Sequence, residues 1–415
     1  MKFSIITPSN REQYLWELYL SILSQTHEDW EWIIYANNGL SVSNLDRLSD
    51  PRVIKVQGPS DGSVTSIGQL KSNAFLQGTG DVLVEVDHDD ILTRDCLSKL
   101  AEAFQDPEIG FVYSNNAKLH HEDKFIPYQA EMGWHHKRFQ YGENELWAPQ
   151  SFAPTSHSLS YIWFAPDHVR AWRTSIYREL GGHNVNMSVL DDQELMIRTY
   201  LKTKFKHIED VLYIYRIDGN NTWINRAQEI QEGTVRLANQ YSQKLAERDA
   251  QLNGKILVDI GGGLNPRKGY LTLDLHKADI KCDLNNDWPL DTDSVGVINA
   301  SHVIEHLRDP IHTMSEIHRV LCHGGWAFIE VPSTDGRGAF QDPTHVSFWN
   351  QNSFWYYTRS EQAAFIRNES IRFQCYRNET HFPNQWWQDN NIPVVTAHLV
   401  AIKQETPRFP GALEI

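Results

Sequence analysis

The sequence predicts an α/β protein built from two doubly wound domains in series. Residues 1–222 alternate short apolar, strand-like segments with amphipathic, helix-like segments, and a second alternation of the same kind occupies residues 254–415. Between them, residues 223–253 are polar, helix-like and rich in Gln, Glu, Lys and Arg, and Gly254 ends the run. We therefore expect two domains joined by a helical linker.

The composition is that of an ordinary soluble protein, with 40% hydrophobic and 22% charged residues. No apolar run approaches the roughly 20 residues that span a bilayer, and the N-terminus lacks a signal-peptide pattern, so we expect a cytoplasmic location. The net charge of −15 counts against a nucleic-acid partner. The four cysteines lack metal-ligand spacing, and we expect reduced thiols.

In the first domain, each predicted strand is followed by polar residues. Strands are expected at residues 3–7, 31–35, 53–56, 82–86 and 111–113, with helices at 12–24, 67–77 and 93–104 between them. Such alternation favours a mainly parallel sheet with helices on both faces. Ligands of these sheets bind at the carboxyl ends of the strands. That edge would carry Thr7-Pro8-Ser9, Asn37-Asn38 and Asp87-His88-Asp89-Asp90.

The acidic stretch Asp87-His88-Asp89-Asp90 has two interpretations. Carboxylates two residues apart can converge on one hard cation, and a cation beside the carboxyl end of a strand can hold a diphosphate. Alternatively, Asp89 or Asp90 caps a helix that begins near Leu92.

Residues 115–165 break the alternation with paired histidines and with tryptophans among polar residues: His120, His121, His135, His136, Trp134, Trp147 and Trp163. A long irregular segment in a compact domain is usually functional or disordered, and the aromatic residues argue against disorder. We interpret the segment as an acceptor-binding loop whose histidines are solvated, although a metal cluster is an alternative.

The first domain resembles the inverting family-2 glycosyltransferases of GT-A fold over residues 2–221. The resemblance rests on an ordered set of motifs: Ile5-Ile6-Thr7-Pro8, Gly68-Gln69-Leu70-Lys71-Ser72-Asn73, Asp87-His88-Asp89-Asp90, Gly181-Gly182, Asp191-Asp192-Gln193-Glu194-Leu195 with Arg198, and Tyr215-Arg216. The resemblance implies a nucleotide-sugar site formed by Thr7, Pro8, Ser9, Arg11, Asn37, Asn38, Lys71, Asn73, Asp87 and His88.

The same resemblance implies a catalytic metal and a general base. Asp87 and Asp89 would lie at a Mn²⁺ or Mg²⁺ ion that neutralises the diphosphate leaving group. Asp192 aligns with the base that deprotonates the acceptor hydroxyl, and Asp191 with the acid that precedes it. A structural alternative for Asp191-Asp192 is a helix N-terminus stabilised by the helix dipole, and both roles can hold together.

Two positions depart from the family pattern. Asn37-Asn38 stands where the family usually has two acids, one of which reads the nucleotide base, so the donor base could differ from uracil. Asp218 replaces a histidine that often follows the Tyr-Arg pair. It could complete a hard-metal shell or form a turn with Gly219.

The second domain begins with a glycine loop after a buried strand, Val258-Asp259-Ile260-Gly261-Gly262-Gly263. This loop, with Asp274, Cys282-Asp283-Leu284, residues 302–307 and Asp342-Pro343-Thr344-His345, resembles class I S-adenosylmethionine-dependent methyltransferases over residues 253–403. The resemblance implies a Rossmann-like fold and a glycine loop that passes under the methionine part of the cofactor without a metal. Cofactor-binding residues are then expected at Asp259, Gly261, Gly263, Asp274, Asp283, Leu284 and His302.

The methyl-accepting side is less defined by sequence. Methylation of a hydroxyl needs a nearby base, and His302, His306, Asp342 and His345 are the polar candidates. We select His345. The alternatives are that His345 is a plain loop residue and that His302 and His306, four residues apart, line one helix face.

Together these features predict a bifunctional carbohydrate-modifying enzyme. A nucleotide-diphosphate sugar would donate its sugar to a glycan or glycolipid hydroxyl, and S-adenosylmethionine would methylate the sugar. One alternative keeps the glycosyltransferase and makes the second domain a non-catalytic docking module. Another is an enzyme that glycosylates a DNA base, which the acidic composition disfavours.

Overall fold

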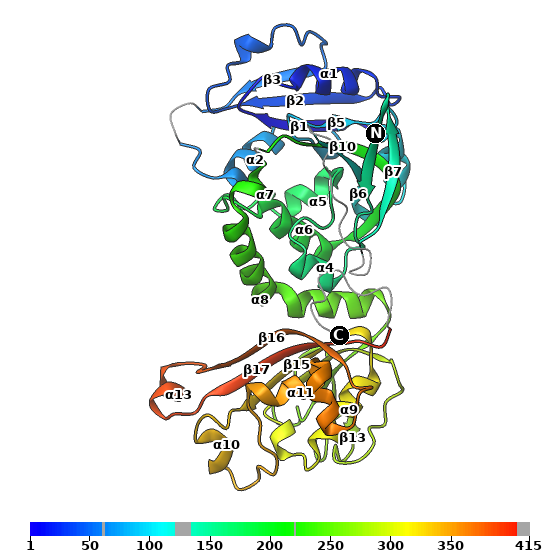
Figure 1. Cartoon of the computed structure of the whole chain (residues 1–415). Coiled ribbons are helices and arrows are strands. Elements are labelled where there is room, and N and C mark those ends of the chain that lie inside the picture. Colours follow the sequence, from blue (N-terminus) through cyan, green and yellow to red (C-terminus); the bar gives the residue numbers. More distant parts are fainter. Residues whose placement is uncertain (60–62, 121–133, 220, 405–415) are drawn as a thin grey trace. The chain divides into compact units, whose positions relative to one another are not determined.

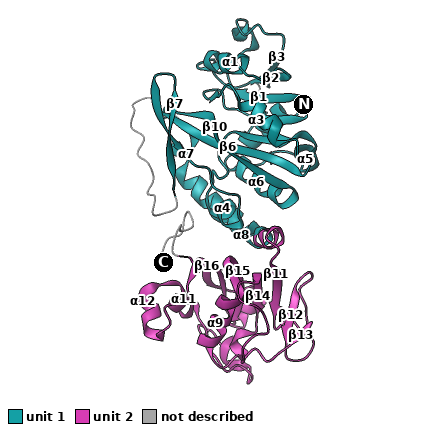
Figure 2. Ribbon diagram, turned by 90° about the vertical axis from the view of Figure 1, so that its right-hand side faces the viewer, with its two compact units in different colours: residues 1–245 teal, residues 246–415 magenta. Residues whose placement is uncertain are grey.

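The computed structural model describes residues 1–59, 63–120, 134–219 and 221–404, and it divides into two compact units, Met1–Leu245 and Ala246–Ile415 (Figures 1 and 2). Both units are α/β, as the sequence predicts. The division falls inside helix α8 (Ala227–Leu252), within the stretch expected as a linker. In the described residues, no helix is long and apolar enough to cross a membrane.

The first unit contains one large sheet with strand order β3-β2-β1-β4-β9-β6-β10-β5, extended beside β6 by the hairpin of β7 and β8. The strands are β1 (Phe3–Ser9), β2 (Trp30–Ala36), β3 (Val53–Gln57), β4 (Val82–Glu85), β5 (Ile91–Leu92), β6 (Ile109–His120), β7 (His136–Tyr141), β8 (Asn144–Pro149), β9 (Arg170–Arg173) and β10 (Lys204–Ile217).

Helices cover both faces of this sheet, because alternate strand residues point to opposite sides. Phe3 and Ile5 pack with helices α1 and α3, whereas Ile6 packs with α2, α5 and α6. The helices are α1 (Leu15–Leu23), α2 (Ile67–Phe75), α3 (Cys96–Ala103), α4 (Ser156–Tyr161), α5 (Thr174–Glu179), α6 (Asp191–Lys202) and α7 (Thr222–Asn225). Ile230, Leu237 and Leu245 of α8 join the same core, so this helix is a packed element rather than a free linker.

The expectation of a mainly parallel sheet is correct for β1 to β4 and for the pair β6 and β10, and wrong for β9, β5 and the β7–β8 hairpin. The four-residue strand β9 inserts antiparallel between β4 and β6, and β5 pairs antiparallel with β10. β9 begins and ends with arginine, so it lacks the apolar alternation that marks a strand in sequence.

The segment expected to be irregular is largely ordered. β6 runs on to His120, β7 and β8 form a hairpin, and α4 follows. Residues 121–133, which include His121, lie outside the described residues. The polar character that hid these strands from sequence analysis arises because the hairpin is only half-buried.

The second unit has a sheet of order β13-β12-β11-β14-β15-β17-β16, parallel except where β17 joins β15 and β16. Its strands are β11 (Ile256–Ile260), β12 (Leu271–Asp274), β13 (Ile280–Lys281), β14 (Val295–Ser301), β15 (Leu321–Pro332), β16 (Phe373–His381) and β17 (Val394–Ala401). Its helices are α9 (Pro310–Val320), α10 (Gly338–Gln341), α11 (Trp355–Thr358), α12 (Ser360–Ala363) and α13 (Gln385–Asp389).

The core of the second unit is formed between this sheet and its helices. Met314, Ile317 and Val320 of α9 pack against alternate residues of β14 and β15. A short 3₁₀ helix, η3 (Ile304–His306), follows β14 directly, so the residues expected to share one face of a helix, His302 and His306, do not. His302 has a positive φ of 52° and precedes the helical turn.

Candidate functional site

A cavity of about 860 Å³ lies at the carboxyl ends of the central strands of the first unit. Ligands of doubly wound sheets bind at this edge. Sequence-predicted residues in its lining are Pro8, Arg11, Asn37, Asn38, Lys71, Asp87, His88, Asp89, Asp191 and Asp192. The structure therefore brings together residues that are as much as 184 positions apart in the chain.

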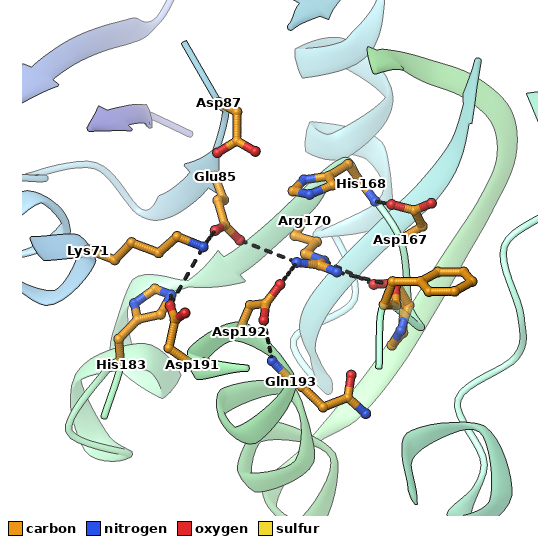
Figure 3. Close-up of polar contacts among 12 residues, drawn as sticks. Lys71, Glu85, Asp87, Asp167, His168, Arg170, His183, Asp191, Asp192 and Gln193 are labelled. Carbon is orange, nitrogen blue, oxygen red and sulfur yellow. Dashed lines mark hydrogen bonds and ion pairs between the residues drawn. The ribbon is translucent and has the colours of Figure 1, made fainter. Parts of the chain in front are cut away.

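Lys71 of α2, in the cavity lining, is the cation between two acids, Glu85 and Asp191 (Figure 3). Its Nζ lies 2.6 Å from Glu85 Oε1 and 3.6 Å from Asp191 Oδ2. Burial raises the pKa of Glu85, but Lys71 and Arg170 together lower it to about 2. Glu85 is therefore a fixed negative charge that anchors two cations.

Arg170 is the second cation of this network, and strand β9 places it. The antiparallel pairing of β4 and β9 sets Arg170 directly across from Glu85. Its guanidinium donates to Asp192 Oδ2 at 2.5 Å and lies 4.0 Å from Glu85 Oε2 (Figure 3). Arg170 is only 2% exposed, so its charge requires these partners.

Asp191 and Asp192 begin α6 and have opposite electrostatic environments. Burial raises the pKa of Asp191 to about 7, assisted by Asp192 and Glu85 and opposed by Lys71. Burial acts in the same direction on Asp192, but Arg170 and Lys71 outweigh it and hold the Asp192 pKa well below its usual range. Asp192 is thus the ionised member of the pair, and its side chain is 23% exposed, against 4% for Asp191.

The start of α6 also agrees with the structural alternative for Asp191-Asp192, a helix N-terminus stabilised by the helix dipole. The first turn of α6 contains Asp191, Asp192 and Glu194, where carboxylates favour the helix dipole. Asp192 Oδ1 accepts a hydrogen bond from the Gln193 amide at 2.8 Å. The helix end therefore fixes Asp192 while leaving it at the cavity.

On the opposite side of the cavity, Arg11 lies among three predicted ligand-binding residues. Its guanidinium contacts Asp89 Oδ2 at 2.9 Å and Asp218 Oδ2 at 3.5 Å, and its Nε donates to His88 Nε2 at 2.7 Å. Two carboxylates from separate elements thus face one positive charge. Burial raises the pKa of the neighbouring Asp87 to about 6, and the charges of Glu85 and Asp89 add to the rise although Lys71 opposes it.

The helix-cap interpretation of the acidic stretch is wrong. α3 begins at Cys96, after Asp95, which is well beyond the stretch. The buried Asp90 instead accepts hydrogen bonds from the Tyr213 hydroxyl (2.7 Å) and the Arg216 amide (2.7 Å) of β10. Asp90 therefore ties the loop after β4 to β10 and holds its neighbours at the cavity.

Some predicted nucleotide-sugar residues do not line this cavity. The fully buried Thr7 accepts a hydrogen bond from Trp32 Nε1 at 3.0 Å, and the Ser9 hydroxyl donates to the Arg11 carbonyl at 2.7 Å. Asn73 lies on α2 outside the lining. Asn37 lines the cavity, but its amide group donates to the carbonyls of Ser9 and Tyr35, so it also ties β1 to β2.

A further wall of the cavity lies outside the predicted nucleotide-sugar residues, and no role was predicted for Asp167, His168 and Arg170 in it. This wall carries charged and aromatic side chains: Lys118, Trp134, Trp163, Asp167, His168, Arg170 and Tyr215. Lys118 pairs with Asp167 at 3.2 Å, and burial lowers the pKa of His168 to about 4, so this ring is neutral. The tryptophans of residues 115–165 signalled this wall, but Arg170 gave no signal because its partners are remote in sequence.

In the second unit, the glycine loop after β11 is tightly packed. Gly261 has a φ of +71°, and a Cβ there would lie 2.4 Å from Val303 Cγ2. Asp274 accepts hydrogen bonds from the amides of Gly263 (3.2 Å) and His276 (3.0 Å). Asp259 accepts from the Arg267 amide and from Asn299 Nδ2, so its carboxylate holds the loop.

The remaining predicted cofactor residues have mixed surroundings. Leu284 is buried in the core of the second unit, and Asp283 accepts hydrogen bonds from the backbone and side chain of Asn285. His302 Nε2 lies 3.2 Å from Glu330 and its Nδ1 lies 3.6 Å from Glu305. These two acids raise the pKa of His302 to about 9, so the ring is cationic at neutral pH.

His345, the predicted base of the second domain, faces protein groups. Its side chain is 7% exposed, its Nδ1 lies 2.9 Å from the Ala339 carbonyl, and its Nε2 lies 3.9 Å from Glu305 Oε1. Trp387 of α13 stacks on His302, with ring centroids 6.0 Å apart.

Family models match both halves of the chain. Residues 4–164 match the glycosyl transferase family 2 model, and residues 228–395 match a methyltransferase domain model. The first match ends before β9, so Arg170, Asp191 and Asp192 lie beyond it.

Individual proteins show lower similarity. An uncharacterized glycosyltransferase of Nostoc sp. strain PCC 7120 is 25% identical over 271 residues, which cover 63% of this chain and 78% of the relative. Among solved structures, residues 1–349 of S. aureus TarS in complex with UDP-GlcNAc align at 15% identity and a TM-score of 0.44, covering 65% of this chain and 77% of that one. The mannosyltransferase PcManGT from Pyrobaculum calidifontis, in complex with GDP-Man and Mn²⁺, aligns at 14% identity and 0.42, covering 60% and 69%.

The matched models both describe transferases. The chain joins a glycosyltransferase domain of family 2 to a methyltransferase domain.

Proposed function

We propose that the first unit transfers a sugar from a nucleotide-diphosphate donor to a glycan or glycolipid hydroxyl, with inversion at the anomeric carbon and with a divalent metal. The observation that carries this proposal is the single cavity in which Asp87 and Asp89, after β4, lie across from Asp191 and Asp192, at the start of α6. Separate acids on two sides suit a reaction that must stabilise a leaving group on one face and deprotonate a nucleophile on the other.

The residues around Arg11 fit a hard divalent cation. Asp89 and Asp218 already converge on a positive charge, the Arg11 guanidinium, and carboxylate oxygens are the ligands that Mn²⁺ and Mg²⁺ prefer. Asp87, Asp89 and Asp218 would hold the ion once Arg11 turns away toward the donor phosphates. When bound, the ion would neutralise the negative charge that develops on the diphosphate leaving group.

Asp192 is the proposed general base. In the reaction the acceptor oxygen forms a bond to the anomeric carbon, the bond from that carbon to the diphosphate oxygen breaks, and the hydroxyl proton passes to Asp192. Arg170 keeps Asp192 ionised and oriented at the cavity. An ion-paired carboxylate is a weak base, so its contribution would rest on its position relative to the acceptor hydroxyl.

Asp191 would have a positioning role. It shares Lys71 with Glu85, and its partly protonated state at neutral pH limits the negative charge beside Asp192. Pro8, Asn37 and Asn38 would face the nucleotide, with Asn38 the more exposed of the two amides. Because Asn offers both donor and acceptor groups, the proposal includes donors whose nucleotide base is not uracil.

The second unit would use S-adenosylmethionine to methylate the transferred or acceptor sugar. The close passage of Gly261 beside Val303 and the Asp274 carboxylate next to Gly263 support a cofactor site, since a carboxylate can accept both hydroxyls of a ribose. The cofactor supplies the electrophilic methyl group. His345 as the base stays a prediction, and its surroundings support a different role below.

Radiolabel transfer tests both halves. Full-length protein is incubated with isolated glycans, Mn²⁺, and either labelled nucleotide sugars or labelled S-adenosylmethionine. We expect transfer of the sugar label only with metal, and transfer of the methyl label to the glycosylated product. Methyl transfer without sugar transfer, in any metal and with any donor, would contradict the first half. Failure of S-adenosylmethionine to bind by calorimetry would remove the second half and favour a docking module.

A further inference from the structure

A group of three metal-ligating side chains lies in the second unit. Among the described residues, Glu305, His306 and His345 each offer a ligand atom, and these atoms lie within 4.8 Å of one another. Two residues come from η3 and the third from the loop at residues 342–347. The 3₁₀ helix η3 comes shortly after the end of β14. In the sheet, β14 lies next to β11, the strand that precedes the glycine loop.

The carboxylate of Glu305 has no hydrogen-bond partner for either oxygen although the residue is only 2% exposed. A buried carboxylate without hydrogen bonds is costly. Two imidazoles face the same oxygen, Glu305 Oε1: His302 Nδ1 lies 3.6 Å from it and His345 Nε2 lies 3.9 Å from it, both beyond hydrogen-bond distance. A cation between Glu305 and the imidazoles of His306 and His345 would satisfy these oxygens.

Both imidazoles of the cluster are oriented with a free nitrogen. His345 Nδ1 lies 2.9 Å from the Ala339 carbonyl, which can only accept, so Nδ1 carries the proton and Nε2 is left with a lone pair. His306 Nδ1 lies 3.1 Å from both the carbonyl and the hydroxyl oxygen of Thr344, and that hydroxyl donates to Asp342. His306 Nδ1 is therefore also the donor.

This arrangement is typical of metal-binding histidines, whose second ring nitrogen donates to a carbonyl or carboxylate. The loop that carries His345 is also fixed against η3, because the amides of Val346 and Ser347 both donate to the Glu305 carbonyl, at 2.9 and 3.0 Å. The exposed Asp342 adds a possible fourth ligand, with Oδ2 at 4.0 Å from His345 Nε2.

We propose that Glu305, His306 and His345 bind a divalent transition-metal ion. Two imidazoles and one carboxylate form a donor set suited to Zn²⁺ and its neighbours, and the half-exposed side of the cluster at His306 and Asp342 leaves room for a further oxygen ligand. The inference goes beyond the proposed function. It also gives His345 Nε2 to the metal, and a coordinated nitrogen cannot take a proton from a hydroxyl.

Zinc binding to the full chain tests the site. Asp87→Asn and Asp89→Asn are introduced together to remove the acids of the first unit, and the protein is dialysed against Zn²⁺ and analysed for bound metal. We expect about one tightly bound equivalent. Glu305→Gln and His345→Gln, each added to this background, should weaken zinc binding by about tenfold or more.

His312→Gln is the matched control, since His312 lies on α9 of the same unit, outside the cluster. It should bind zinc like the background protein. Circular dichroism and thermal unfolding show whether each variant folds, and Co²⁺ in place of Zn²⁺ should give a visible absorption that both cluster variants lose. Equal zinc binding by Glu305→Gln, His345→Gln and the control, or no bound zinc at all, would overturn the proposal.

Discussion

Buried ion pairs hold the side chains at the sheet edge of the first unit, whereas a close backbone approach shapes the glycine loop of the second unit. At the first edge, Lys71 and Arg170 are each held between acids, and the pKa values of Asp87, Asp191 and Glu85 are all displaced. At the second, Gly261 passes Val303 where no side chain fits. The first site should therefore respond to changes of charge, and the second to changes of volume.

Removing the ionised acid of the first site should have the largest effect. Asp192→Asn keeps the shape but loses the proposed base and leaves the buried Arg170 without its closest partner. We expect glycosyl transfer to fall by about 10³-fold or more, with S-adenosylmethionine binding unchanged. Steady-state transfer assays measure the first quantity, and calorimetry measures the second.

Asp46→Asn is the control for this variant, because Asp46 is exposed and remote from the cavity lining. It should transfer sugar at the wild-type rate. An Asp192→Asn enzyme within tenfold of that rate would show that another group takes the proton.

Adding one methyl group should separate the second site from the first. Gly261→Ala places a Cβ 2.4 Å from Val303 Cγ2 at a φ of +71°, whereas Gly269→Ala, at +85°, meets nothing within 4 Å. Both variants bear the backbone strain, of about 1 kcal/mol, but only Gly261→Ala has the overlap. We expect it to weaken S-adenosylmethionine binding about tenfold or more and to leave sugar transfer intact; equal binding by the two variants would place the cofactor elsewhere.

The smallest expected effect is on stability and depends on pH. Because the pKa of Asp87 is raised to about 6 in the fold, its protonated form stabilises the metal-free protein at low pH, and this contribution is lost as pH rises through about 6. Asp87→Asn should therefore raise the free energy of unfolding at pH 7.5 by on the order of 1 kcal/mol, and by less at pH 4. Denaturant titrations without metal check this.

In the same titrations, Mn²⁺ should stabilise the wild-type protein and not Asp87→Asn, because only the former offers the carboxylate. If Asp87→Asn were less stable than the wild-type protein at pH 7.5, the ionised Asp87 carboxylate would stabilise the fold, which contradicts its raised pKa.

Local patterns were sufficient to predict the two α/β folds and much of the first cavity. The strands with apolar alternation, and the polar residues that follow them, converge because parallel strands end at one edge. β9 could not be predicted, because it is four residues long and has arginine at both ends. Arg170 is accommodated in a buried strand only because it faces Glu85 across the sheet.

The metal-ligating cluster shows a different limit. Its two histidines were recognised as polar candidates and Glu305 was not, and His306 and His345 meet because the loop that carries His345 folds back on η3. Likewise, Thr7 and Asp259 match motifs, yet their side chains hold Trp32 and the glycine loop in place. A motif specifies residue types, and the surrounding fold decides which of them face a ligand.

The most direct test of two separate sites is one variant measured in two ways. Asp89→Asn removes a carboxylate that contacts Arg11 at the proposed cation position of the first unit. Metal-dependent sugar transfer and S-adenosylmethionine affinity are measured on the same preparation. The two-site account predicts loss of sugar transfer with unchanged cofactor affinity. Loss of both, in a protein that remains folded by circular dichroism, would contradict it.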